Sequence, residues 1–183
     1  SKNVRHNLRG TDDVGSGNNG IMVEVAGLGR VTVPWRRFES VTFQAGHGSG
    51  PGRNVYRNAG PLQGDLTDSD GVVHRGRLVF DLDEAWLWDI FNGTDAAGLE
   101  YNIPFHQLAR IETAKDQICR VILRSGLALE LGENQDTGDD HAGVLVFASS
   151  GAAAEHLAWR QVQSITFSHQ ADEIRSKKPK KLK

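Results

Sequence analysis

The chain has 183 residues, of which 38% are hydrophobic, and a formal net charge of −2. Domains commonly run about 100 to 150 residues, so this length allows one domain or two to three small ones. No apolar run is long enough to cross a bilayer, and the residues after Ser1 show no signal-peptide pattern. We therefore predict no membrane span.

The charge is distributed unevenly. The segment 176–183 holds five of the 21 basic residues, so the remaining 16 stand against 23 acidic residues, a net charge of −7. A body of that sign repels phosphate backbones, so we predict no nucleic-acid partner. We interpret 169–183 as a basic tail that is a solubilising end, with a nuclear or anionic-surface signal as the alternative.

Three stretches of the chain share one pattern, with an aromatic residue followed by spaced apolar residues. They are Val33–Phe43, Ile103–Thr113 and Leu157–Phe167. The first and third extend upstream, since residues 7–23 align without a gap on residues 130–146, and one extra residue then restores the register of Trp35 on Trp159. The chain is therefore a repeat protein with units of type B, A and B.

This pattern divides the chain into five parts. They are an incomplete unit of type B (1–43), a glycine-rich linker (44–59), a unit of type A (60–114), a second unit of type B (115–168) and the tail. The linker contains GHGSGPG, which lacks the Gly-Lys-Ser/Thr and the following helix of a phosphate-binding loop, so no cofactor is predicted.

The first unit lacks a counterpart of the predicted strand Cys119–Leu123. It is expected to begin at a hairpin turn, which leaves the segment Val4–Leu8 with an unpaired edge. We expect another segment, Arg53–Tyr56 or Asp172–Arg175, or a second copy of the protein to complete it; fraying is the alternative. A second copy would make a homo-oligomer through the incomplete first unit.

Strand signals dominate the units. Cys119, Val121 and Leu123 alternate with polar or outward residues, Ser125–Gly126 marks a tight hairpin, and the alternation resumes at Leu127. This alternation predicts that Cys119 is a buried, inert thiol, and a single cysteine excludes an internal disulfide.

No window predicts a helix of three turns. The spans that begin at Trp35, Phe105 and Trp159 fit one turn before a last strand, and we expect Trp35 and Trp159 to be equivalent and buried. Short strands with one such turn predict an all-β fold of tandem small SH3-like or Sm-like barrels, with the first unit incomplete at its N-terminus.

The succession of these motifs resembles a group of uncharacterised bacterial exported proteins. The resemblance rests on RGRLVFDLDEAWLWDIFNG, NIPFHQLARIE, VILRSGLALEL and LAWRQVQSITF, and covers residues 8–43 and 60–167. It implies tandem SH3-like repeats with paired A and B units and a periplasmic or secreted location, and it assigns no activity.

Acidic turns are the first candidates for chemistry. Asp68-Ser69-Asp70-Gly71 resembles the centre of a calcium loop, but the first ligand and the bidentate glutamate are missing, so a hairpin turn explains it better. Residues 11–13 and 135–140 place acids at matching positions of the two B units, where weak calcium binding is the alternative to simple duplication.

The segment 80–89 is the second candidate. It places the acids Asp81, Asp83 and Glu84 beside Trp86 and Trp88. Paired acids can serve glycoside hydrolysis, but a small barrel has little room for the deep cleft that such pairs occupy. We predict no catalytic residues here and a binding role instead. The two tryptophans share a predicted strand face, so one is expected in the core while the other offers a stacking platform.

The histidines show no zinc-binding spacing, and we predict no metal site from them; they are His6, His47, His74, His106, His141, His156 and His169. The sequence thus predicts a non-enzymatic binding or scaffolding module of a bacterial envelope or secreted protein, with a protein or glycan partner. A calcium-dependent or carbohydrate-binding accessory domain is the alternative.

Overall fold

A computed structural model describes residues 17–43, 60–148 and 153–168. The chain is all-β in these ranges, with two antiparallel sheets and no α-helix, as the sequence predicts. Several predictions fall outside the described residues. They concern Val4–Leu8, Arg53–Tyr56, Asp172–Arg175, the acidic residues 11–13, the linker 44–59 and the tail 169–183.

The elements alternate short strands with single 3₁₀ turns. In chain order they are β1 (Ile21–Val25), β2 (Gly29–Val33), η1 (Trp35–Arg37), β3 (Gln63–Asp68), β4 (Val73–Phe80), β5 (Ile90–Thr94), β6 (Glu100–Pro104), η3 (Phe105–Gln107), β7 (Leu108–Thr113), β8 (Cys119–Leu123), β9 (Ala128–Leu131), β10 (Val144–Phe147), β11 (Glu155–Leu157), η4 (Trp159–Gln161) and β12 (Val162–Phe167).

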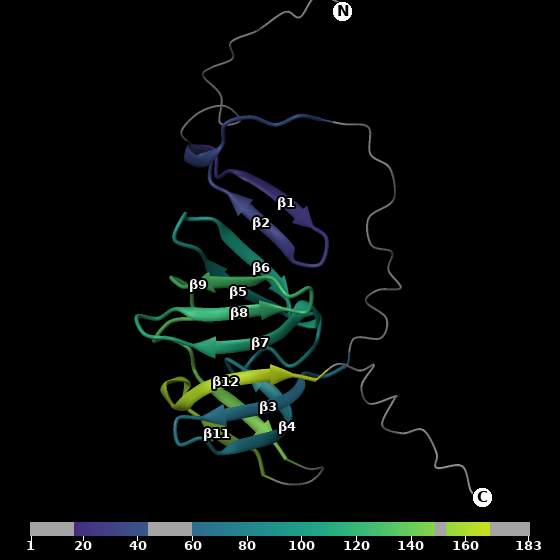
Figure 1. The fold of residues 1–183 in the computed structure, drawn as a ribbon, viewed down its shortest axis with the longest axis vertical. Coiled ribbons are helices and arrows are strands. Elements are labelled where there is room, and N and C mark those ends of the chain that lie inside the picture. Colours follow the sequence, from purple (N-terminus) through teal and green to yellow (C-terminus); the bar gives the residue numbers. More distant parts are fainter. Residues whose placement is uncertain (1–16, 44–59, 149–152, 169–183) are drawn as a thin grey trace, which may run out of the picture.

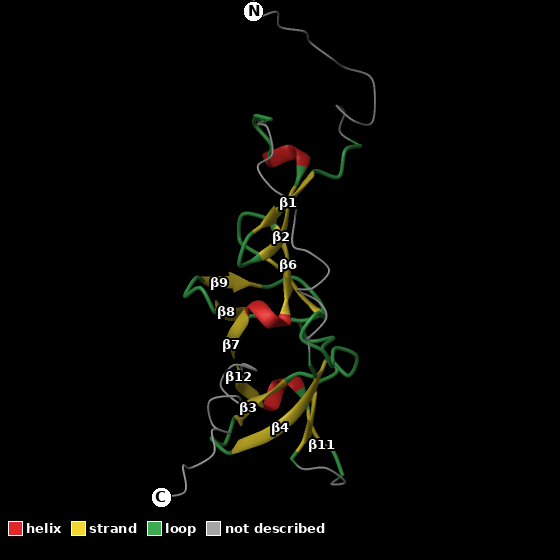
Figure 2. Cartoon of the chain, turned by 90° about the vertical axis from the view of Figure 1, so that its right-hand side faces the viewer, coloured by secondary structure: helices red, strands yellow, loops and turns green. Residues whose placement is uncertain are grey.

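The 3₁₀ turns lie where the repeat predicts them. Pro34 and Pro104 precede η1 and η3, where a missing N–H costs no hydrogen bond. Each is a single turn that ends in extended backbone, and η3 leads into β7 and η4 into β12. Turned by 90°, the molecule shows the three turns one above another along its long axis (Figure 2).

The larger sheet has the strand order β11-β10-β4-β3-β12-β7-β8-β9, and the smaller one has the order β1-β2-β6-β5 (Figure 1). Strands of the two sequence units therefore alternate within one sheet. The β3–β4 hairpin of the type A unit lies between β12 and β10 of the last B unit. The β8–β9 hairpin of that B unit pairs with β7 of the A unit, and a bridge joins Thr94 to Gly132 beyond it.

This exchange of hairpins is reciprocal. The backbone N–H of Ser69 in the β3–β4 turn donates to the carbonyl of Gln161 over 2.7 Å, and that of Arg124 in the β8–β9 turn donates to the carbonyl of Gln107 over 2.8 Å. Gln161 and Gln107 close equivalent 3₁₀ turns. The register also shifts at the start of both last strands, in β12 and in β7. The A and B units are thus related by an approximate two-fold arrangement.

The sequence predicts small SH3-like or Sm-like barrels; the described residues form two antiparallel sheets of four and eight strands, and no closed barrel is present among them. The strand content and the 3₁₀ turns match that plan, but each hairpin pairs across to the other unit. A hairpin that leaves its own unit cannot close that unit into a barrel. Sequence periodicity determines which residues face the core, but it does not determine which unit supplies the neighbouring strand.

The core is shared by both units. Phe80, Phe91 and Phe105 are fully buried, and their rings meet at tilted or edge-to-face angles with centroids 5.3 to 6.4 Å apart. Trp159 lies at the margin of this core and is half-buried, as is Trp35 in the first unit. The predicted equivalence of the two tryptophans is confirmed in position, but neither indole is fully buried.

The first unit attaches through β2, which pairs antiparallel with β6 over three residue pairs. It contributes only Leu28 and Val31 to the buried apolar residues of the described chain. Within those same ranges, no helix has the length and apolar character needed to span a membrane.

Candidate functional site

The acidic segment after β4 is a turn, where the sequence predicts a strand. Asp81 and Leu82 have φ values of 46° and 67°, and the N–H groups of Asp83 and Glu84 both donate to the carbonyl of Phe80. This turn carries Asp81 inward, where its carboxylate accepts hydrogen bonds from the Gln135 side chain and the Ala142 backbone. Asp81 thus anchors the loop 132–143, which connects β9 to β10.

Trp86 and Trp88 both face solvent, which corrects the prediction that one of them lies in the core. Their exposed fractions are 45% and 40%, and their rings stack in parallel with centroids 5.0 Å apart. The physical reason is the turn around them. One carboxylate oxygen of Asp89 accepts hydrogen bonds from the N–H groups of Ala85 and Trp86, so the strict strand alternation is absent before β5.

The predicted acids belong to a partly buried group of carboxyls at the junction of the two units. Burial raises the pKa of Asp136 to about 6, although the backbone N–H of Asn92 donates to it. Burial and a hydrogen bond with Asp83 raise the pKa of Glu84 to about 9. Glu84 is therefore protonated at neutral pH, which reduces the repulsion among these side chains.

His141 belongs to the same junction. Burial lowers its pKa to about 4, so the imidazole is neutral, and its Nδ1 accepts a hydrogen bond from the N–H of Gly143. Its ring stacks on the indole of Trp159, with centroids 3.9 Å apart and planes at 5°. The edge of the same indole meets Phe80. These contacts hold Trp159 in one orientation.

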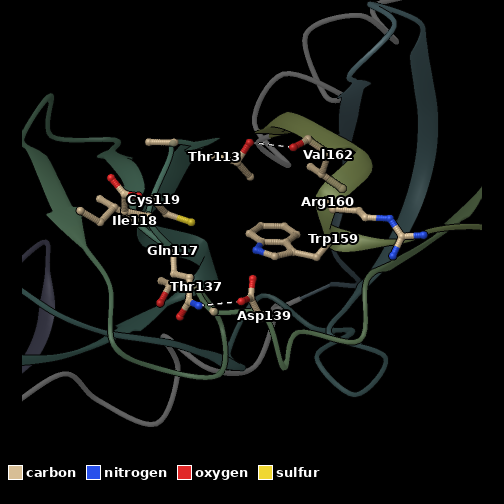
Figure 3. Close-up of a pocket in the computed structure, with 12 residues that line it drawn as sticks. Thr113, Gln117, Ile118, Cys119, Thr137, Asp139, Trp159, Arg160 and Val162 are labelled. Atoms are coloured by element: carbon tan, nitrogen blue, oxygen red, sulfur yellow. Dashed lines mark hydrogen bonds between the residues drawn. The ribbon is translucent and has the colours of Figure 1, made fainter.

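A pocket of about 390 Å³ opens beside Trp159. Its walls come from the turn between β7 and β8, the loop that follows β9, and η4 with the start of β12. Figure 3 shows the indole of Trp159 at the centre of the pocket, with Cys119 to its left and Asp139 below it. The lining residues are Thr113, Ala114, Asp116, Gln117, Ile118, Cys119, Thr137, Gly138, Asp139, Trp159, Arg160 and Val162.

The pocket combines one aromatic wall with polar side chains of several kinds. The amide of Gln117 donates to the carboxylate of Asp139 over 2.6 Å, and the hydroxyl of Thr113 donates to the carbonyl of Val162 over 2.7 Å. Arg160 is exposed at the rim. An indole face, a carboxylate, an amide and a guanidinium can bind a compact ring that carries several hydroxyl groups.

Cys119 lies in the wall of this pocket and is buried, as predicted. Burial raises the pKa of its thiol to about 12, with a smaller contribution from Asp136. A neutral thiol is a poor nucleophile, so Cys119 acts as an apolar wall atom.

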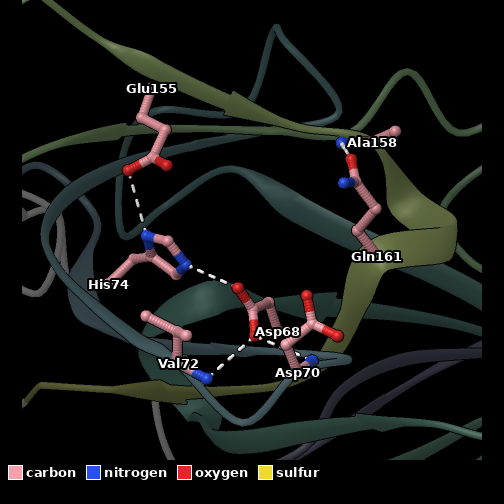
Figure 4. A network of polar contacts seen from close by, with 7 residues as sticks. All are labelled: Asp68, Asp70, Val72, His74, Glu155, Ala158 and Gln161. Carbon is pink, nitrogen blue, oxygen red and sulfur yellow. Dashed lines mark hydrogen bonds and ion pairs between the residues drawn. The ribbon is translucent and has the colours of Figure 1, made fainter.

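The Asp68–Gly71 turn joins β3 to β4, as the hairpin interpretation predicts, and Asp68 accepts backbone N–H groups from Asp70 and Val72. Its other carboxylate oxygen lies 2.9 Å from His74, whose second ring nitrogen lies 3.0 Å from Glu155 on β11 (Figure 4). The hydrogen bond with Asp68 raises the pKa of His74. This network joins the hairpin of the A unit to the far edge of the B unit.

No three His, Cys, Asp or Glu side chains come together to hold a metal ion within 17–43, 60–148 and 153–168. Asp81 accepts a hydrogen bond from the side chain of Gln135, and Asp136 accepts one from the backbone N–H of Asn92 on β5. Comparison with known proteins identifies no relative, since no family model, curated protein or solved structure matches the chain.

The structure separates the predicted site residues. Trp86 and Trp88 form an exposed stacked pair, whereas Asp81 is buried and used for loop anchoring. Sequence reasoning did not select the pocket beside Trp159. Its polar members come from both units, and the repeat alignment compares units without showing which surfaces meet. The one available signal was the aromatic residue shared by all three repeats.

Proposed function

We propose that the protein is a non-enzymatic binding module built from paired SH3-like repeats, and that its ligand site is the pocket beside Trp159. The SH3-like plan is supported by one set of five strands with a single 3₁₀ turn before the last of them. The set consists of the exchanged hairpin β3–β4 together with β10, β11, η4 and β12. The resemblance noted in the sequence supports an exported, envelope or secreted location.

One observation carries the proposed function. The indole of Trp159 is held by stacking on His141 and borders a pocket whose other walls offer a carboxylate, an amide and a guanidinium. A rigid aromatic platform with polar groups around it fits a sugar ring, whose faces carry C–H groups and whose rim carries hydroxyls. A glycan is therefore the partner that we favour.

Buried carboxyls support a binding role over catalysis. Asp81 accepts hydrogen bonds from the loop that follows β9, and Asp136 accepts one from the backbone N–H of Asn92 on β5. General acid and base groups must instead reach the substrate. The two carboxyls with raised pKa values, Glu84 and Asp136, lie outside the set of residues that line the pocket.

Titration with a panel of bacterial envelope saccharides tests this function, with the indole N–H signals followed by NMR. We expect the Trp159 signal to shift on binding, and Trp159→Leu to abolish binding. Trp88→Leu is the matched control, because Trp88 belongs to the stacked pair that the sequence predicts as a platform. Loss of binding in Trp88→Leu alone would place the site at that pair, and the absence of any shift with all saccharides would refute a glycan partner.

A further inference from the structure

The first unit leaves apolar side chains uncovered at positions where the last unit buries them. Residues 38–43 follow η1 as β12 follows η4, yet they pair with no strand in the described part of the chain. Val41 is 50% exposed whereas its counterpart Ile165 is 0% exposed. Phe43 is 90% exposed whereas its counterpart Phe167 is 4% exposed.

The same difference runs along β1. Val23 is 44% exposed whereas its counterpart Val146 on β10 is 2% exposed, and Met22 beside it is 66% exposed. Val23, Val41 and Phe43 are thus exposed at positions that the last unit buries, and exposed apolar patches mark interaction surfaces. We call the surface formed by residues 21–24 and 38–43 the open face.

The last unit shows which element covers such a surface. There the β3–β4 hairpin lies between the two equivalent strands, with β3 paired to β12 and β4 paired to β10. Leu66 of β3 is opposite Ile165, and Leu78 of β4 is opposite Val146. The open face therefore lacks one β-hairpin.

Neither of the two exchanged hairpins, β3–β4 and β8–β9, is available to fill this position. The β3–β4 hairpin is held between β12 and β10, and the β8–β9 hairpin is held between β7 and the Thr94–Gly132 bridge. Moving either one would expose the core that it now covers. A hairpin that covers the open face must therefore come from outside the described residues.

We propose that the open face binds a β-hairpin of the β3–β4 type, donated by a type A unit of a partner protein. The donor strands complete the sheet on both sides of the gap, as in other cases of strand addition. This surface lies on the first unit, away from the Trp159 pocket, so the proposal is independent of the proposed function.

The repeat alignment gives the register. The donor equivalent of Leu66 lies opposite Val41, and the donor equivalent of Leu78 lies opposite Val23. The donor equivalent of Arg77 then lies opposite Glu24, where the last unit has Phe147 beneath Arg77. Glu24 is exposed and pairs with Arg30 over 2.8 Å, so an arginine at this donor position would share the Glu24 carboxylate with Arg30.

The donor also needs glycine at two positions. In the last unit, a Cβ atom on Gly64 would lie 2.3 Å from the carbonyl oxygen of Thr166. A Cβ atom on Gly76 would lie 2.1 Å from the carbonyl oxygen of Phe147. The equivalent carbonyl groups of the open face belong to Thr42 and Glu24, so the same two donor positions must stay small.

The test uses the full chain and a peptide with the sequence of residues 61–80. An isolated hairpin is marginally stable in water, so a second format joins a further copy of 61–80 after Lys183 through a flexible Gly/Ser linker, which raises the effective concentration to about the millimolar range. Hydrogen exchange and amide NMR shifts of residues 21–24 and 38–43 report on binding. We expect these amides to become protected.

Two variants test the contacts. Val41→Asp should weaken binding at least about tenfold while leaving the fold intact, because Val41 is half exposed and pairs with no strand in the described part of the chain. A peptide with Gly76→Val should not bind. Leu127→Asp is the matched control, since Leu127 is similarly exposed in the β8–β9 turn, and it should bind the peptide as the unchanged protein does.

Every other result overturns the proposal. Equal binding by Val41→Asp would place the peptide elsewhere, and lack of protection in both formats would show that the face accepts no hairpin. Protection of residues 38–43 in the protein alone would identify a different occupant. If that protection does not change with protein concentration, the occupant is a segment of the same chain. If it increases with protein concentration, the occupant is a second copy.

Discussion

Gly76 offers a direct test of the exchange between units, because it lies in β4 of the A unit against β10 of the B unit. A Cβ atom at this position would lie 2.1 Å from the carbonyl oxygen of Phe147, 2.7 Å from its carbonyl carbon and 3.1 Å from the Cα of Ala148. All three atoms are backbone, so no side-chain rotation relieves the overlap. The Gly76→Ala variant must therefore push β10 away from β4.

Overpacking of this kind costs about 1 to 3 kcal/mol, and we expect the upper end because backbone must move. With a urea m-value of about 2 kcal/mol per molar, a loss of about 3 kcal/mol lowers the unfolding midpoint by about 1.5 M. Gly71→Ala in the same hairpin is the control. Its Cβ meets nothing within 4 Å, and only its φ of 81° opposes the change, so we expect about 1 kcal/mol. Equal midpoints for the two variants would refute the pairing of β4 with β10.

Three further predictions concern side chains. His141 has a pKa of about 4 when folded, below its usual value near 6.5, so its contribution to stability is present above pH 6.5 and lost as the pH falls towards 4. Asp136 has a raised pKa and acts in the opposite direction, so the pH dependence of the wild type must be compared with that of His141→Asn. This variant should remove up to about 3 kcal/mol of the acid-dependent loss of stability measured by urea unfolding. An unchanged pH profile would contradict the role of His141. His74 has a raised pKa through Asp68, so its contribution is complete below pH 6.5 and lost at higher pH; the difference in urea midpoint between the wild type and His74→Gln should be larger at pH 6 than at pH 8.5. Trp159→Ala should cost about 3 kcal/mol by urea unfolding, near the lower end for a large aromatic residue because the indole is half-buried, and a loss below about 1 kcal/mol would show that its stacking on His141 adds little.

Local structure was predictable where it depends on neighbouring residues. The alternation of Cys119, Val121 and Leu123 gave the inner face of β8, and the Asp68–Gly71 and Ser125–Gly126 turns lie at the ends of the predicted hairpins. Turn residues and side-chain alternation act over a few residues, so a single sequence contains this information.

The arrangement of the units was not predictable in the same way. Both hairpins carry apolar residues with a period of two, and that pattern is satisfied equally by the parent unit and by its neighbour. The candidate site depends on this choice, because Cys119 lies on β8, which pairs with β7, whereas Trp159 lies on η4, which leads into β12. Likewise, Trp86 and Trp88 alternate as in a strand, but Asp89 binds the N–H groups of this segment and turns it outward.

The exchange also predicts how stability is distributed along the chain. Each hairpin of the A–B pair covers the core of the other unit, so the strands β3 to β12 should open together. Among the described residues of the first unit only Leu28 and Val31 are apolar and buried, and β2 pairs with β6 over three residue pairs, so this unit should open at lower free energy. Native-state hydrogen exchange measures this difference, and we expect the amides of β1 and β2 to exchange at least about tenfold faster than those of β3 and β12, which corresponds to about 1.4 kcal/mol. Equal protection in the two regions would show that the first unit is an integral part of the core.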